Sequence, residues 1–138
     1  ILGTNYIDKK IISKLVDSDK KFDLFTKVEF IYNNSVSSLK VGKGVKSEGQ
    51  LVVTGSTGYV YVPAPWWKTD YFEVRYENQT DNKRYFYQLE GEGIRYELLA
   101  FVKSINEERN SSKINKEISC AISSVIEDFE NNIDCISI

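Results

Sequence analysis

The sequence predicts an α+β domain, with a largely antiparallel open sheet of about seven strands and two C-terminal helices packed on one of its faces. Up to Leu89 the chain consists of short segments rich in Val, Ile, Tyr and Phe, separated by Gly-, Asn- and Ser-rich turns. Short turns favour antiparallel pairing. After Gly93 the apolar spacing becomes helical. A chain of 138 residues is long enough to bury a core, so we expect a single domain over residues 1–138.

The expected strands follow one another at short intervals. They comprise residues 10–16, 24–32, 36–41, 50–53, 59–62, 71–77 and 84–89. Residues 10–16 carry apolar side chains on both alternations, as in a strand covered on both faces. We expect a charged turn at residues 17–21 and hairpin turns at 33–35 and 54–58.

Two helices are expected after the sheet. The first has its apolar positions at Ile94, Leu98, Phe101, Val102 and Ile105, and the second at Ile118, Ala121, Ile122, Val125 and Phe129. Asn115 precedes the second helix and is a suitable N-cap. Cys120 lies on its apolar side, where we expect a small buried hydrophobe and no disulfide with Cys135.

A corner of the chain combines two prolines with two tryptophans. Pro63 and Pro65 end ladder pairing because proline has no N–H, and Trp66 and Trp67 follow at once. Such aromatic area is most often a packed lid over the end of a sheet, since aromatic rings dominate core energetics. The other interpretation is a platform on which a ligand stacks.

Aromatic residues also recur on one alternation of the later strands. Tyr59, Tyr61, Tyr71 and Phe86 share it with the charged Glu73 and Arg75. A large exposed patch of this kind marks an interface, and a symmetric dimer is the commonest way to cover it. The alternative is that strand twist scatters these rings over both faces.

Composition excludes several classes of function. A net charge of −2 gives no electrostatic footprint for nucleic acid. No apolar run approaches the ~20 residues that span a bilayer, and no signal peptide opens the chain, so we expect a cytoplasmic protein without a membrane partner. The absence of histidine removes the commonest acid–base group and metal ligand. Because there is also no methionine, we expect the chain to be part of a longer or processed protein.

Lysines and glycines alternate in the stretch GKGVKSEG, residues 42–49. Gly-rich backbone can present N–H groups to an anion, with Lys43 or Lys46 facing the ligand. The spacing matches neither phosphate-binding fingerprint, and no helix follows. A bulge or turn beside a strand edge guarded by Lys40, Lys43 and Lys46 is the simpler interpretation.

The stretch GSTGYVYVPAPWWKTDYFEVRYEN, followed by KRYFYQLEGEGIRYELLAFVKSI, resembles the C-terminal domain of the Gfo/Idh/MocA oxidoreductases. The upstream VGKGVKSEGQLVVTG and the downstream SKINKEISCAISSVIEDF fit the same pattern. The resemblance covers residues 25–129. Its most specific part is the glycine turn followed by the Pro-Ala-Pro-Trp-Trp corner.

This resemblance implies an enzyme that transfers hydride between NAD or NADP and a sugar, polyol or related substrate. The cofactor and a catalytic lysine would belong to an N-terminal Rossmann domain. Ile1-Leu2-Gly3 looks like the end of a helix that carries further catalytic residues, which would then lie upstream of Ile1. No catalytic, cofactor-binding or metal-binding residue can therefore be assigned in this chain, and alone it should be inactive.

For this chain the resemblance implies a substrate-pocket wall and an oligomer interface on the open sheet face. Its partners would be the Rossmann domain, further copies of the protein and a small-molecule substrate. Trp66, Trp67 and Lys46 are the candidate substrate-binding residues. Two alternatives stay open: a stand-alone carbohydrate-binding module that uses Trp66 and Trp67, and a scaffold domain that only assembles partners.

Overall fold

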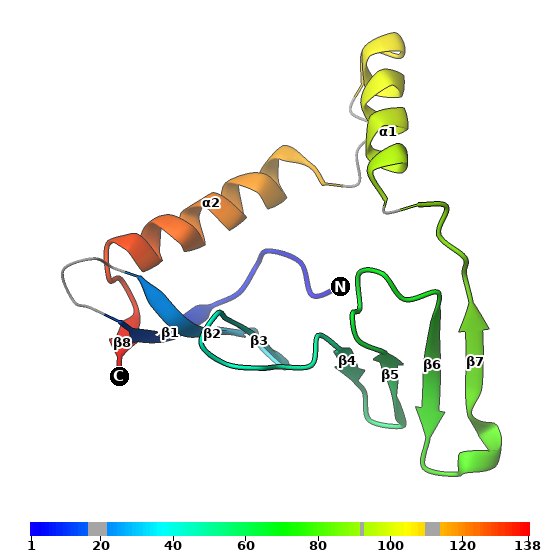
Figure 1. The fold of residues 1–138 in the computed structure, drawn as a ribbon, viewed down its shortest axis with the longest axis horizontal. Helices are drawn as coiled ribbons and strands as arrows, with labels where there is room; N and C mark the ends of the chain where they lie inside the picture. Colours follow the sequence, from blue (N-terminus) through cyan, green and yellow to red (C-terminus); the bar gives the residue numbers. More distant parts are fainter. Residues whose placement is uncertain (17–21, 92, 110–113) are drawn as a thin grey trace. The chain divides into compact units, whose positions relative to one another are not determined.

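A computed structural model of the protein describes residues 1–16, 22–91, 93–109 and 114–138. Within them the chain forms eight strands, two α-helices and one short 3-10 helix, with both α-helices in the C-terminal part (Figure 1). The expected α+β class is confirmed. By its internal contacts the chain divides into two compact units, one of Ile1–Ser47 with Lys113–Ile138 and one of Glu48–Ser112. A single domain over residues 1–138 stays a prediction.

All seven expected strands are present. They are β1 (Asp8–Leu15), β2 (Asp23–Ile31), β3 (Val36–Gly42), β4 (Leu51–Thr54), β5 (Gly58–Val62), β6 (Tyr71–Tyr76) and β7 (Lys83–Phe86). The hairpin turn after β2 is also confirmed, since the Tyr32 N–H donates to the Ser35 carbonyl at 2.9 Å. The charged turn expected at residues 17–21 lies outside the described residues.

The strands divide over two sheets, where the sequence suggested one. The first unit holds sheet A in the order β3-β2-β1-β8, and the second holds sheet B in the order β4-β5-β6-β7. The additional strand, β8 (Cys135–Ser137), pairs parallel with β1, whereas the other neighbouring strands are antiparallel. Alternation along the chain identifies strands, but it does not determine which edges pair.

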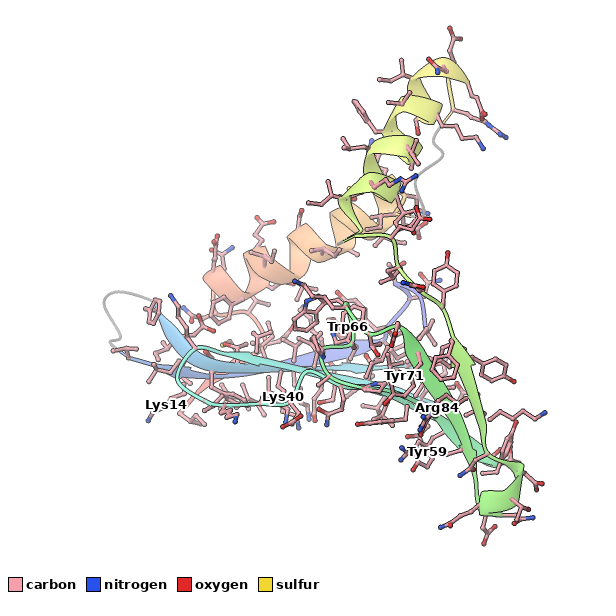
Figure 2. All side chains as sticks on the ribbon, turned by 45° about the vertical axis from the view of Figure 1, so that its right-hand side comes forward. Lys14, Lys40, Tyr59, Trp66, Tyr71 and Arg84 are labelled. Atoms are coloured by element: carbon pink, nitrogen blue, oxygen red, sulfur yellow. The ribbon has the colours of Figure 1, made fainter. Side chains whose placement is uncertain are left out.

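Sheet A is buried on one face only. Lys9, Ile11 and Ser13 of β1 are buried, while Lys10 and Lys14 on the other alternation are exposed. The expectation that this strand is covered on both faces is therefore wrong. In Figure 2 the labelled Lys14 and Lys40 lie on the face turned away from the helix of this unit. Charged side chains suit that face because it remains in water.

The helix that covers the buried face is α2 (Lys116–Glu130). It runs alongside the strands of sheet A in Figure 1. Phe30 and Leu39 from the sheet and Ile122 and Val125 from α2 line one apolar groove of about 340 Å³. The expected N-cap is confirmed, since the Asn115 Oδ1 accepts a hydrogen bond from the Ile118 N–H at 2.9 Å.

A buried lysine ties β1 to α2 and to the turn before β8. The Lys9 Nζ lies 2.8 Å from the Asp128 Oδ2 and 2.9 Å from the Asp134 Oδ2. The hydrogen bonds that Lys9 donates to these two carboxylates raise its pKa above the ordinary value. Asp134 has φ of 54°, an uncommon left-handed conformation for a non-glycine residue. The ion pairs thus help to hold the C-terminal strand in place.

In sheet B, the two faces differ in chemistry. Val60 of β5 pairs with Val74 of β6, and Phe72 stacks on Tyr85 with ring centroids 5.0 Å apart. These side chains make one face largely apolar. The other face carries the tyrosines and arginines described below.

The second unit also contains α1 (Ile94–Asn106), at the position that the helical spacing predicts. Gly93 precedes it with φ of 91°, a conformation that suits glycine. Its large apolar side chains are exposed in the structure. Packing of this helix against a sheet face therefore stays a prediction.

Both cysteines are free, as expected. The expectation that Cys120 is buried is wrong, because it is exposed on α2. The apolar stripe that faces sheet A passes through Ile118, Ala121 and Val125, so Cys120 lies beside the stripe. Cys135 is half-buried, and burial raises the pKa of its thiol.

Candidate functional site

Trp66 and Trp67 lie in the loop between β5 and β6, which we call the tryptophan corner (residues 63–70). The Trp66 N–H donates to the Gly49 carbonyl at 2.7 Å, and the Pro65 carbonyl accepts from the N–H groups of Lys68 and Thr69 at 2.9 and 3.1 Å. The Ala64–Pro65 peptide bond is cis. Backbone bonds on both sides of the indoles hold them in a defined loop.

The two indoles are half-exposed. Their centroids lie 6.0 Å apart in an edge-to-face arrangement, and 51% of Trp66 and 56% of Trp67 is accessible to water. A Cβ added to Gly49 would lie 3.1 Å from the Trp67 ring, so the chain passes close beneath one side of that indole. The exposed area leaves ring surface on which an apolar or sugar-like group could stack.

Lys46 and the tryptophan corner belong to different units of the chain. Lys46 is exposed in the loop between β3 and β4 and belongs to the first unit, whereas both tryptophans belong to the second. The structure therefore does not assemble Lys46 with the tryptophans in one unit, and its role as a ligand contact stays a prediction.

Two glycines near this loop, Gly42 at the end of β3 and Gly44 within the loop, serve local packing. The Gly44 N–H donates to the Leu24 carbonyl at 3.0 Å, and a Cβ at Gly42 would lie 2.9 Å from that oxygen. The loop thus folds back on β2, and the Gly44 N–H is already used by the protein. This geometry agrees with the turn interpretation and gives no support to a phosphate cradle.

A second surface lies on sheet B, and we call it the arginine–tyrosine face. Strand register places Tyr59 opposite Arg75, Tyr61 opposite Glu73, Glu73 opposite Arg84, and Tyr71 opposite Phe86. Directly opposed residues share a face. The aromatic and charged side chains of this face are therefore Tyr59, Tyr61, Tyr71, Glu73, Arg75, Arg84 and Phe86, and Val52 and Thr54 of β4 lie on the same face. Figure 2 labels Tyr59, Tyr71 and Arg84, which lie together on the strands.

One carboxylate organises the cations of this face. The Glu73 Oε2 accepts from the Arg75 Nε at 2.6 Å, and its Oε1 accepts from the Arg84 Nε at 2.8 Å. Hydrogen bonds from Arg84 and then Arg75 hold the pKa of Glu73 below its usual range. Glu73 therefore stays ionised and keeps both guanidinium groups in place.

The arginines also stack on the tyrosines. The Arg75 guanidinium carbon lies 4.5 Å from the Tyr61 ring centroid, and that of Arg84 lies 4.8 Å from the Tyr71 centroid. Each stack is a cation–π contact. A shallow hollow of about 590 Å³ adjoins Tyr59, Glu73, Glu77 and both arginines.

The expected sharing of one face by the four aromatic rings is confirmed by the strand register. Sequence reasoning missed Arg84 and the bridging role of Glu73. The signal for Arg84 was present, because it alternates in phase with Phe86. The bridge depends on cross-strand register, which the sequence does not show directly.

The described residues contain no cluster of three or more His, Cys, Asp or Glu side chains that could hold a metal ion. In the same part of the chain, no helix is both long and apolar enough to cross a membrane. The two surfaces present exposed indole rings at the tryptophan corner and stacked tyrosines with fixed charges on sheet B.

Comparison with protein-family models gives no match, and no curated protein matches the chain. Among solved structures, the chain is similar to a mutant of KijD10, a 3-ketoreductase from Actinomadura kijaniata, in complex with TDP-benzene and NADP. The TM-score is 0.72 at 10% sequence identity, over 95% of this chain and 43% of that one. The chain thus spans less than half the length of KijD10. At this identity the likeness shows that the two share a fold.

Proposed function

We propose that the chain is the C-terminal domain of an NAD(P)-dependent oxidoreductase of the Gfo/Idh/MocA type. The main support is the fold likeness to KijD10, an NADP-complexed ketoreductase, over nearly the whole of this chain. The resemblance of residues 55–76 to the family is independent support, because it rests on the glycine turn and the Pro-Ala-Pro-Trp-Trp corner. The substrate would be a sugar, a polyol or a related hydroxy or carbonyl compound.

In this proposal the chain supplies binding surface and a separate domain supplies the reaction. The nicotinamide cofactor would be held by a Rossmann domain, which also carries the catalytic lysine. The residues of this chain would then orient a polar substrate and exclude water from it. That division explains why the chain has abundant aromatic surface and no histidine.

The tryptophan corner is the part of this chain best suited to the substrate. Two half-exposed indoles are held by backbone hydrogen bonds to Gly49 and within residues 65–69. Because their backbone is fixed, ordering them around a ligand would cost little entropy. The flat face of an indole matches the apolar face of a sugar ring.

The test is steady-state kinetics of the intact oxidoreductase with Trp67→Ala. Loss of a stacking contact to the substrate should raise KM at least about tenfold and change kcat less, whereas Trp67→Phe should retain most of the affinity. Tyr87→Ala is the matched control, since Tyr87 is an aromatic residue of the same unit that is 64% exposed. Unchanged kinetics in Trp67→Ala and in Trp66→Ala would remove the corner from the substrate pocket.

A stand-alone carbohydrate-binding module is the second candidate, and the half-exposed Trp66 and Trp67 are the observation that favours it. It is distinguished by titrating this chain alone with neutral sugars. A saturable change in tryptophan fluorescence that is absent from the Trp66→Ala and Trp67→Ala variants would favour the module. We expect no such change, because a pocket wall alone does not enclose a ligand.

A further inference from the structure

The outer face of sheet A, which is turned away from α2, collects lysines from three strands. Lys10 and Lys14 of β1, Lys27 of β2 and Lys40 of β3 all lie on the alternation opposite to the buried one. Figure 2 labels Lys14 and Lys40 on this face. We call the four residues the lysine face. The strand register brings them together, although they are distant in sequence.

Protection of a sheet edge does not explain these lysines. Exposed lysines deter edge-to-edge pairing where a strand lacks a neighbour. The edge strands of sheet A are β3 and β8, so only Lys40 lies on an edge strand. Lys10, Lys14 and Lys27 belong to interior strands, and Lys27 has a paired residue on either side, Ile12 and Lys40. The accumulation of positive charge therefore has another reason.

The arrangement is unfavourable for the stability of the sheet. Lys27 lies directly opposite Lys40 across the ladder, and like charges in that position destabilise a sheet. The Glu29 Oε1 accepts a hydrogen bond from the Lys27 Nζ at 2.7 Å, which holds the pKa of Glu29 below its usual range. This carboxylate can neutralise one lysine of the pair but not both. Proteins retain such local conflicts mainly where they serve a contact.

The lysine face is basic although the chain is acidic overall. The carboxylates on the same alternation are Glu29 and Asp8, and Asp8 lies at the first position of β1. Asp23 accepts a hydrogen bond at 2.6 Å from the hydroxyl of Thr26, which belongs to the buried face. Residues 17–21 contain two aspartates and two lysines and so add no net charge. Four lysines thus outweigh two carboxylates, in a chain of net charge −2.

Apolar side chains separate the lysines. Successive outward positions of β1 carry Lys10, Ile12 and Lys14, and Phe25 of β2 lies opposite Lys14. Ile12 and Phe25 are half-buried, so part of each remains for a partner. An extended segment presents every second side chain to one side, with the same spacing as a strand of the sheet. A segment with acidic, apolar and acidic residues at those positions therefore complements the face in charge and in spacing.

Polymers of phosphate suit this face less well than carboxylates do. The planar fork of arginine matches phosphate oxygens, and the sequence of the first unit contains no arginine. A nucleic acid or an anionic bilayer also extends beyond the lysine face, so the net charge of −2 opposes its approach. A short acidic segment contacts the lysine face alone. The observations therefore favour a polypeptide partner.

We propose that the lysine face binds an extended acidic segment of a partner protein, in which carboxylate side chains alternate with apolar ones. The carboxylates pair with Lys27 and Lys40. The apolar side chains lie on Ile12 and Phe25. Exposed ion pairs are individually weak, so the complex is transient and sensitive to salt. The inference goes beyond the proposed oxidoreductase function and does not depend on it.

The test is fluorescence anisotropy with a labelled peptide of alternating glutamate and valine, as long as β1. At low salt we expect saturable binding to the chain with a Kd on the order of 100 µM, and loss of binding at about 0.5 M NaCl. The same peptide with glutamine in place of glutamate should not bind, since it retains the apolar side chains and lacks the charge. Amide NMR shifts should change on β1, β2 and β3.

Lys40→Glu supplies a second readout that distinguishes binding from a structural role. It places an acid opposite Lys27, so it should weaken peptide binding at least about threefold and raise the midpoint of urea unfolding. Lys116→Glu is the matched control, because it makes the same change of charge at the first residue of α2, on the helix that covers the opposite face. We expect it to leave peptide binding unchanged.

Three results would overturn the inference. The first is no saturable binding of the peptide at chain concentrations up to about 1 mM. The second is equal weakening of binding by Lys40→Glu and Lys116→Glu. The third is tighter binding of single-stranded DNA or of phosphatidylserine vesicles through the same lysines, which would make phosphate the preferred group. None of them bears on the oxidoreductase proposal, whose test is the kinetic effect of Trp67→Ala.

Discussion

In the first unit, a few charged side chains help to fix the C-terminal strand β8 against the rest of the sheet. Lys9 lies on the buried alternation of β1, where an unpaired ammonium would be costly. Asp128 on α2 and Asp134 before β8 each approach it within hydrogen-bonding distance. A contact between residues 9 and 134 thus joins the two ends of the chain, although β8 itself contributes only three paired residues.

We expect Lys9→Met to lower the free energy of unfolding by about 2 kcal/mol. The value lies below the 3–5 kcal/mol of a fully buried pair because the Asp134 side chain is 45% exposed. Urea unfolding monitored by circular dichroism measures it. Lys10→Met, on the exposed alternation of the same strand, should change stability by less than about 0.5 kcal/mol.

The pH dependence of this ion pair has a definite sign. The pKa of Lys9 is raised on folding, so its contribution is fully present below the ordinary value of 10.5 and is lost only as the pH rises through the raised value. The stability difference between the protein and Lys9→Met should therefore be constant from pH 7 to 9. A difference that disappears within that range would contradict the ion pairs.

Glu73 should give the second unit an acid-sensitive component of stability. Its pKa is lowered in the folded protein, so its contribution is present above the ordinary value of 4.5 and is lost as the pH falls through the lowered value. Urea unfolding at a series of pH values from 6 to 3 should show this loss, and Glu73→Gln should lack it. Glu77→Gln, at another carboxylate beside the same hollow, should retain it.

At the level of elements, α2 illustrates how far local sequence determines structure. Its apolar spacing and its N-cap were both predicted, and the helix begins immediately after Asn115 as expected. The periodicity predicts which face of the helix packs against a sheet. It does not predict whether residues at the margins of that face are buried. Cys120 was assigned to the buried side and is exposed, because it lies at the margin of the stripe.

Replacing the cap tests this helix directly. Asn115→Ala removes the acceptor for the Ile118 N–H and should cost about 1 kcal/mol of stability, seen as a lower midpoint of urea unfolding. Asn131→Ala at the other end of α2 is the matched control. Asn131 makes its cap contacts through its backbone N–H, so we expect a smaller effect. Equal effects would show that the side chain of Asn115 does not cap the helix.

The strands were predicted well for a related reason. Alternation placed the four aromatic rings of sheet B with Glu73 and Arg75 on one face, and the register confirms it. The three-residue β8 was missed because it is too short to show a period. It is a strand because it pairs with β1. The sequence also did not predict how closely β6 approaches Gly58. A Cβ at Gly58 would lie 2.6 Å from the Arg75 carbonyl oxygen of that neighbouring strand.

At the scale of the whole molecule, the described elements form antiparallel sheets with C-terminal helices, and β8 is the parallel exception. A Gly-rich turn between a parallel strand and a helix is the usual site of a dinucleotide. We therefore expect calorimetric titration of this chain with NADH and NADPH to show no binding. The intact oxidoreductase is the positive control, and micromolar affinity in the chain alone would contradict the proposed division of labour.

From the sequence alone one can locate the main strands, both helices and the tryptophan corner that interrupts the ladder, and one can identify the alternation of the sheet B strands that shares a face. These properties depend on neighbours a few residues apart, through side-chain periodicity and the missing N–H of proline. Three features became visible only in the folded chain: the division of strands over two sheets, the pairing of Lys9 with Asp128 and Asp134, and the bridge from Glu73 to two arginines. Those contacts join residues distant in sequence, and their geometry depends on register and packing that no local pattern specifies.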